Sequence, residues 1–194
     1  MDDPRVLSYR DVLWDKKEVG KRVAIVGAGG IGFDVAEFLS YGDSHQMQTE
    51  TYMKEWGVDM EYKKPGATAA PEDSPSPREI YLLKRSIGKH GKGLGKTTGW
   101  IHRASLKKKE VIMHSQCEYL AMTEKGFKVK IGDEVSVLEV DNVVICAGQE
   151  SHDLISSKLQ LDPTHVHVIG GAKNAKGLDA KRAIKEAAYL AAKL

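Results

Sequence analysis

The sequence predicts an α/β fold that combines a parallel sheet with an antiparallel β-meander. Three observations lead to this prediction. Residues 23–39 read as a buried strand, a glycine-rich turn and an amphipathic helix. Residues 118–140 hold three segments of alternating apolar and polar side chains, separated by turn residues. Residues 142–147 form a strand that is apolar throughout, which is typical of parallel sheets buried on both faces.

The first of these segments carries the most informative pattern in the chain. An apolar, β-branched-rich run over residues 23–26 leads into Gly27-x-Gly29-x-x-Gly32. In this spacing the first glycine makes a tight turn, the second leaves room for a pyrophosphate, and the third lets the helix pack on the strand. The helix N-terminus, where Gly30 also lies, then faces the phosphates. The pattern predicts a dinucleotide-binding turn, with a purely structural turn as the alternative.

The segment after the turn begins as a helix and continues as a long excursion. Near-helical spacing of Ile31, Val35, Phe38 and Leu39 predicts the helix. An acidic residue that binds the adenosine ribose is expected about 20 positions after the turn, at the end of a second strand. No strand is predicted there. Residues 42–78 are instead polar and rich in Pro, Gly and Ser, which predicts a surface excursion with a partly disordered, proline-rich end.

The next predicted strand, residues 78–83, ends in two basic residues. Arg85 stands where an NAD-specific site would place a carboxylate, and a guanidinium there can pair bidentately with a 2′-phosphate. Lys89 adds a second cation. These residues favour NADP over NAD, and a solvated basic loop is the alternative.

The stretch from His90 to Thr97 resembles the end of a P-loop. That motif requires glycine at the position of His90 and a strand directly before the loop, so nucleoside triphosphate binding is not expected. Thr97 or Thr98 is instead expected to cap a helix over residues 99–108.

Residues 110–147 are predicted to form extended strands. The last of these strands is apolar and stops at Gly148, as parallel strands often do beside a ligand crevice. The expected strands cover residues 110–114, 118–122, 127–131, 135–140 and 142–147.

The C-terminal segment is predicted to be one strand and one helix. The strand, residues 166–169, stops at Gly170-Gly171, and Asp179 is placed to cap a helix over residues 180–194. A strand, a glycine pair and a helix N-terminus can hold one edge of a flavin or its phosphates. By pattern alone, a structural αβ ending is the alternative.

Composition limits the partners. The chain has 194 residues, 41% hydrophobic and 29% charged, enough for one good core or two small ones. No apolar run approaches the ~20 residues that span a membrane, so no membrane partner is expected. Net charge is only +2, and the basic residues between 84 and 109 lack aromatic interleaving. A small phosphorylated ligand is therefore expected rather than nucleic acid.

The two cysteines and the N-terminal residues indicate the compartment. Cys117 and Cys146 are far apart and lack partners at metal-ligand spacing, so reduced thiols are expected and no metal site. The start, MDDPRVLSYRD, has neither a signal sequence nor a transit-peptide pattern. A cytoplasmic location is the expectation.

Over nearly its whole length the sequence resembles the C-terminal part of the bacterial 2,4-dienoyl-CoA reductases. These are iron–sulfur flavoenzymes of the old yellow enzyme and trimethylamine dehydrogenase type. The glycine motifs are generic, whereas GLGKTTGWIHR and NVVICAGQE in this order are specific. The segments that carry the resemblance are VLSYRDVL at 6–13, VAIVGAGGIGFD at 23–34, an EWG-containing excursion near 55, GLGKTTGWIHR at 93–103, DNVVICAGQE at 141–150, and VIGG with LDAKRAI within 168–184.

The resemblance implies that the chain is a fragment. In that family an N-terminal (β/α)8 barrel binds FMN, a four-cysteine segment holds a 4Fe-4S cluster, and an FAD domain carries an inserted NADPH domain. Residues 1–20 would be a linker and helix from the flavin domain, residues 21–148 a three-layer Rossmann-like NADP(H) domain, and residues 149–194 the end of the FAD domain. The barrel and the rest of the FAD domain would be its partners, and no catalytic residue lies in this chain.

The resemblance also implies a function. NADPH would pass a hydride to FAD, and electrons would reach 2,4-dienoyl-CoA in fatty acid β-oxidation through the 4Fe-4S cluster and FMN of the parent enzyme. The isolated chain is expected to bind NADPH without reductase activity. The residues expected to bind cofactor, with a partial FAD site at the end of the chain, are Gly27, Gly29, Gly30, Gly32, Arg85, Lys89, Thr97, Thr98, Gly148, Gly170, Gly171 and Asp179.

Two alternatives stay open. A flavoprotein reductase with another substrate would share these dinucleotide domains and differ in the barrel. A non-catalytic dinucleotide sensor would need only the glycine turn.

Overall fold

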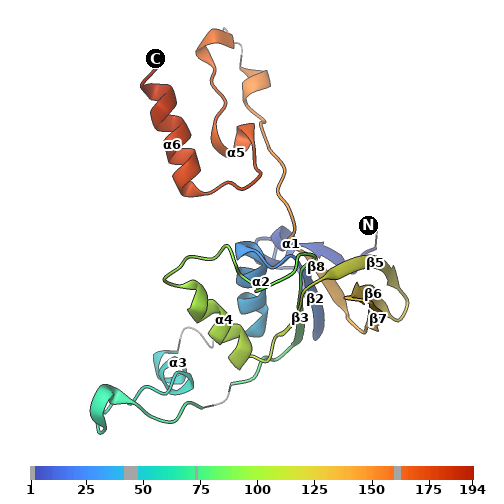
Figure 1. Ribbon diagram of the computed structural model, residues 1–194, viewed down its shortest axis with the longest axis vertical. Helices are drawn as coiled ribbons and strands as arrows, with labels where there is room; N and C mark the ends of the chain where they lie inside the picture. Colours follow the sequence, from blue (N-terminus) through green and yellow to red (C-terminus); the bar gives the residue numbers. More distant parts are fainter. Residues whose placement is uncertain (1–2, 42–47, 73, 160–162) are drawn as a thin grey trace. The chain divides into compact units, whose positions relative to one another are not determined.

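A computed structural model describes residues 3–41, 48–72, 74–159 and 163–194 (Figure 1). The chain forms two compact units, residues 1–147 and 148–194. Residues 42–47 and 73 of the expected excursion lie outside the described residues.

The first unit is built on a parallel sheet. Its strands lie in the order β1-β8-β2-β3-β4, and every neighbouring pair is parallel. The prediction of β2, β3, β4 and β8 is therefore confirmed, whereas the expected linker at the N-terminus contains a further strand, β1, which pairs with β8. The strands are β1 (Val6–Ser8), β2 (Arg22–Val26), β3 (Glu79–Leu83), β4 (Ile112–His114) and β8 (Asn142–Ile145).

The central strands are apolar on both faces because both faces are covered. In β2, Val23 and Ile25 pack into a core that includes Phe33, whereas Ala24 and Val26 pack into a second core. Side chains alternate along a strand, so a run without polar residues supplies two cores at once.

Helices cover the first face. They are α1 (Tyr9–Leu13), α2 (Gly30–Ser40) and α4 (Gly99–Lys108), and Figure 1 shows α4 beside α2. Ser8 and Asp11 form a capping box at the start of α1, which satisfies amides that the helix leaves unpaired.

An antiparallel meander covers the second face. Its strands are β5 (Cys117–Thr123), β6 (Gly126–Ile131) and β7 (Glu134–Leu138), paired in the order β5-β6-β7. Phe127 and Val129 of β6 are fully buried in the same core as Ala24 and Val143. The α/β class, with a Rossmann-like parallel sheet and a meander, is confirmed.

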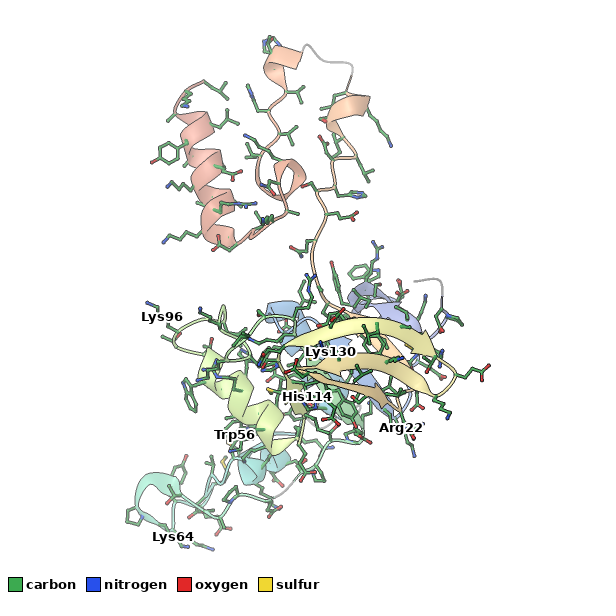
Figure 2. All side chains as sticks on the ribbon, turned by 45° about the vertical axis from the view of Figure 1, so that its right-hand side comes forward. Arg22, Trp56, Lys64, Lys96, His114 and Lys130 are labelled. Atoms are coloured by element: carbon green, nitrogen blue, oxygen red, sulfur yellow. The ribbon has the colours of Figure 1, made fainter. Side chains whose placement is uncertain are left out.

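The expected surface excursion holds more structure than its composition predicts. It contains α3 (Thr49–Glu55), a 3-10 helix, η2 (Pro65–Ala67), and a single bridge between Val58 and Thr68. Lys108 donates to the Glu55 carbonyl and lies over the ring of Trp56, which is labelled in Figure 2. The excursion is therefore docked on the C-terminal end of α4.

A buried ion pair holds this docking. Glu55 and Lys109 are each 2% exposed, and the Lys109 ammonium lies 3.2 Å from the Glu55 carboxylate. The ammonium also donates to the Ser74 carbonyl at 2.7 Å and lies 4.2 Å from the centre of the Tyr41 ring. Sequence reasoning missed it, because Lys109 belongs to a lysine triplet that reads as solvated.

The second unit contains helices and extended chain. Its elements are η3 (Ser156–Lys158), η4 (Pro163–His165), α5 (Gly170–Lys173) and α6 (Ala180–Ala191). The predicted strand at residues 166–169 is wrong: this segment pairs with no strand among the described residues. A strand needs a neighbour to accept its hydrogen bonds, and its apolar pattern alone cannot supply one.

Helix α6 begins where the sequence predicts. The Asp179 carboxylate accepts a hydrogen bond from the Arg182 amide at 2.7 Å, which confirms the cap. No residue of α6 is buried, and Ile184 and Tyr189 are 68% and 61% exposed.

Neither unit offers, in the residues described, a helix both long and apolar enough to cross a membrane.

We expect Lys109→Met to lower the free energy of unfolding by about 3–5 kcal/mol, because it leaves the Glu55 carboxylate buried without its cation. Urea unfolding would measure this change. Lys107→Met, at an exposed position of the same triplet, is the matched control and should change stability by less than about 0.5 kcal/mol. Equal effects of the two substitutions would show that the buried pair does not anchor the excursion.

Candidate functional site

The glycine turn lies at the carboxyl edge of the parallel sheet. Gly27 has a φ of +111°, and its amide donates to the Leu83 carbonyl at 2.9 Å. A Cβ at Gly27 would lie 2.7 Å from the Cys146 carbonyl oxygen. Only glycine fits here, both for its backbone angle and for its closeness to the ends of β3 and β8.

The other glycines of the motif divide into one that is packed and two that are open. A Cβ at Gly32 would lie 1.8 Å from the Gly27 carbonyl oxygen, so this glycine lets α2 pack on the turn. A Cβ at Gly29 or Gly30 would meet nothing within 4 Å. Gly29 is the N-cap of α2 and provides no side-chain hydrogen bond to it. The start of α2 is therefore left open at Gly29 and Gly30, and no capping side chain occupies it, as an anion site at a helix N-terminus requires.

Cys146 lies beside this turn but is no nucleophile. It is 8% exposed, and burial raises the pKa of its thiol to about 12, with Asp34 adding to the rise. A thiol of this kind stays protonated near neutral pH. Cys146 instead belongs to the apolar core of the first face.

The predicted 2′-phosphate residues follow β3 directly. We call residues 84–91 the basic loop. Leu83, whose carbonyl accepts from Gly27, is two positions before Arg85, so the loop starts beside the glycine turn. Arg85 and Lys89 are both exposed. Lys84 instead turns inward on the loop, and its ammonium donates to the carbonyls of Ile87 and Lys89 at 3.4 and 3.0 Å.

His90 closes the basic loop from the other side. It is 8% exposed, and its Nε2 lies 3.1 Å from the His114 carbonyl oxygen. A carbonyl only accepts, so Nε2 must carry the proton in this contact. Burial lowers the pKa of His90, which favours the neutral ring. His90 is thus an interior anchor and not a variant of a P-loop glycine.

Thr97 and Thr98 are exposed at the start of α4. Thr98 is the N-cap residue of α4, which confirms the predicted cap position and the helix over residues 99–108, but its side chain makes no hydrogen bond to the helix. Its backbone has a φ of −113° and a ψ of −22°, outside the extended conformation that a capping side chain usually requires. Both hydroxyls stay available to a ligand.

One contact joins the start of α4 to α2, and two more join these helices to the end of the basic loop. The His102 Nδ1 lies 3.0 Å from a Glu37 carboxylate oxygen. A Cβ at Gly91 would lie 3.0 Å from the ring of Phe33 in α2, so the end of the basic loop also touches that helix. The Arg103 guanidinium donates to the Gly91 carbonyl at 3.4 Å.

The predicted flavin residues, Gly170, Gly171 and Asp179, lie in the second unit. Gly170 has a φ of +60°, and Gly148, predicted to end a strand beside a ligand crevice, has a φ of +87°. The Gly170 amide donates to a Glu186 carboxylate oxygen at 2.7 Å, and a Cβ at Gly171 would lie 2.7 Å from a methyl of Leu178. Asp179 caps α6. These contacts are internal to the unit, and a flavin edge at this place stays a prediction.

The structure thus brings together one part of the predicted site. Gly27, Gly29, Gly30 and Gly32 adjoin the start of the basic loop, which carries Arg85 and Lys89. Sequence reasoning missed Lys84 and His90 as anchors, since a lysine after a strand and a histidine among glycines give no signal of the carbonyls they meet. Among the described residues no cluster of His, Cys, Asp or Glu is arranged to bind a metal ion.

The model of one protein family, described as pyridine nucleotide-disulphide oxidoreductase, matches residues 7–171. A metal reductase from Desulforamulus reducens is 26% identical over 177 residues, which are 91% of this chain and 26% of that protein.

Two solved structures share the fold. A 2-naphthoyl-CoA reductase, in complex with 2-naphthoyl-CoA, is 18% identical with a TM-score of 0.65, over 95% of this chain and 23% of that one. Histamine dehydrogenase from Rhizobium sp. 4-9 is 14% identical with a TM-score of 0.65, over 99% of this chain and 26% of that one. The chain thus spans about a quarter of the length of these relatives.

Substitution by alanine should have different effects at Gly29 and Gly32: the first should weaken dinucleotide binding, and the second should lower stability. Gly29→Ala should leave the free energy of unfolding nearly unchanged, because its methyl group meets open space, but should weaken dinucleotide binding by about tenfold or more, about 1.4 kcal/mol. Gly32→Ala should lose about 3 kcal/mol of stability or more, because its methyl group would overlap the Gly27 carbonyl. Urea unfolding and calorimetric titration with NADPH would separate the two. Unchanged NADPH affinity in folded Gly29→Ala would favour a purely structural turn.

Proposed function

The chain belongs to the pyridine nucleotide-disulphide oxidoreductase family, and from this premise we propose that it is the NADPH-binding portion of a flavoprotein reductase. The observation that carries the proposal is the pair of open glycines, Gly29 and Gly30, at the N-terminus of α2, beside a loop that exposes Arg85 and Lys89. This family uses FAD together with NAD(P)H, so both cofactors belong to the proposal.

The residues have distinct parts in binding NADPH. Amides at the start of α2 would receive the pyrophosphate over Gly29 and Gly30, where no side chain intervenes. Arg85 and Lys89 would pair with the 2′-phosphate of the adenosine ribose, and a guanidinium does so bidentately. Thr97 and Thr98 supply hydroxyls near the start of α4. These residues would hold the NADPH, which would supply a hydride for which FAD would be the acceptor.

We further propose that the parent enzyme reduces 2,4-dienoyl-CoA in fatty acid β-oxidation. The support is the resemblance of residues 93–103 and 141–150 to that enzyme class. A solved relative named 2-naphthoyl-CoA reductase also has an acyl-CoA thioester as its ligand. FMN, the 4Fe-4S cluster and the barrel would belong to the parts of the parent outside this chain. Residues 149–194 would then complete its FAD domain, with Gly170 and Gly171 near the flavin.

A reductase with another electron acceptor is the second candidate. The observation in its favour is the 26% identity to a metal reductase over 91% of this chain. Both candidates share the proposed NADPH site and differ in the segments that bind the final acceptor. A non-catalytic dinucleotide sensor would need the glycine turn alone.

Arg85→Ala should abolish a preference for NADPH over NADH. A charge-assisted bidentate pair is worth roughly 1.5–3 kcal/mol, so the unmodified chain should prefer NADPH by about tenfold or more. Calorimetric titration at constant salt measures both affinities. Lys96→Ala, at an exposed lysine beyond the basic loop and labelled in Figure 2, is the matched control. Equal affinities in the unmodified chain would remove the basis for NADP.

The purified chain without an added barrel should show no NADPH-driven reduction of 2,4-dienoyl-CoA, because the resemblance assigns the residue that protonates the substrate to the barrel. Loss of NADPH absorbance, followed with and without the acyl-CoA, measures this. Turnover by the chain alone would contradict the proposal that this chain binds NADPH while the barrel of the parent enzyme reduces the acyl-CoA.

A further inference from the structure

One carbonyl oxygen, that of His114, holds the first residue of the basic loop close to a residue near the end of the loop. The Lys84 amide donates to the His114 carbonyl at 3.0 Å, and the His90 Nε2 lies 3.1 Å from the same oxygen. A carbonyl oxygen has two lone pairs, so it can accept both bonds. The first and the seventh residue of the stretch from 84 to 90 are therefore tied to one point at the end of β4, where Figure 2 labels His114.

The inside of the loop is fastened by the Lys84 ammonium. It donates to the carbonyls of Ile87 and Lys89, so the chain folds back toward the residue that follows β3. Gly88, with a φ of +96° and open space at its Cβ position, makes this reversal possible. Lys84 is half-buried, whereas Arg85 and Lys89 remain exposed.

The two exposed cations therefore lie on a backbone whose course is already set. A phosphate group that binds Arg85 and Lys89 therefore does not have to order the loop. Because the conformational entropy of the loop is already lost before binding, the affinity for the phosphate is higher. Lys84, by contrast, already directs its donors at backbone carbonyls. Its position next to Arg85 in the sequence suggests a third phosphate ligand. Its hydrogen bonds to the Ile87 and Lys89 carbonyls indicate instead that it holds the backbone of the loop.

We infer that Lys84 and His90 are positioning residues that set selectivity for a 2′-phosphate by holding Arg85 and Lys89 in a closed loop on the His114 carbonyl. This inference rests on the proposed NADPH function and adds determinants that do not touch the ligand.

Lys84→Met and His90→Ala test the inference through the ratio of NADPH to NADH affinity. Methionine keeps an apolar stem of similar length without the ammonium, and alanine removes the imidazole. Each variant should weaken NADPH binding by about tenfold and leave NADH within about twofold. His90→Gln, whose side-chain amide can donate to the His114 carbonyl, should restore part of the loss. Urea unfolding identifies any variant whose loss is a loss of fold.

A double-mutant cycle separates positioning from direct contact. If Lys84 acts through Arg85, then Lys84→Met should have little further effect on NADPH affinity in an Arg85→Ala background. Additive losses would show that Lys84 contacts the phosphate itself and would overturn the inference. Unchanged affinity ratios in both Lys84→Met and His90→Ala would overturn it as well.

Amide hydrogen exchange tests the closed loop without a ligand. Exchange at residues 85–89 should rise in Lys84→Met and in His90→Ala and stay unchanged in Arg85→Ala. No NADPH preference in the unmodified chain would defeat the proposed function and, with it, the assignment of selectivity. A preference that survives both substitutions, with unchanged exchange, would defeat the inference alone.

Discussion

The close approach of backbone at Gly27 is the constraint on which the rest of the first unit depends. Its amide bonds to the end of β3, its missing side chain makes room for the Cys146 carbonyl after β8, and its own carbonyl leaves no room for a side chain at Gly32. Three chain segments thus meet at one residue. The start of α2 is thereby fixed beside the sheet edge, with open space at the Cβ positions of Gly29 and Gly30.

Polar contacts help to hold the periphery of the unit. The Glu55–Lys109 pair anchors the excursion, and a contact between His102 and Glu37 joins α4 to α2. The Glu55–Lys109 pair is buried, and a buried charge without its partner is costly. In the basic loop, the Lys84 ammonium binds carbonyl oxygens and not a carboxylate, and it thereby orders the backbone. Arg85 and Lys89 remain exposed and can bind a ligand.

The predictions and the structure differ where a residue's contacts depend on distant parts of the chain. The glycine spacing predicted the turn, and Arg85 follows β3 as expected. Thr98 is the N-cap residue of α4 as expected, but its side chain makes no hydrogen bond to the helix, since its backbone is not in the extended conformation. Residues 166–169 were expected to form a strand, but no neighbouring strand accepts their hydrogen bonds in the part of the chain that the structure describes.

The sequence by itself determined the α/β class, the parallel strands β2, β3, β4 and β8 and the meander, because periodicity and glycine spacing are local properties of the chain. Tertiary structure alone decided that Lys109 is buried, that β1 joins the sheet, and that one carbonyl, that of His114, receives both Lys84 and His90. The physical reason is distance along the chain. Each of these contacts joins residues far apart in sequence, and the chemistry of a lysine or a histidine does not reveal which acceptor it will meet.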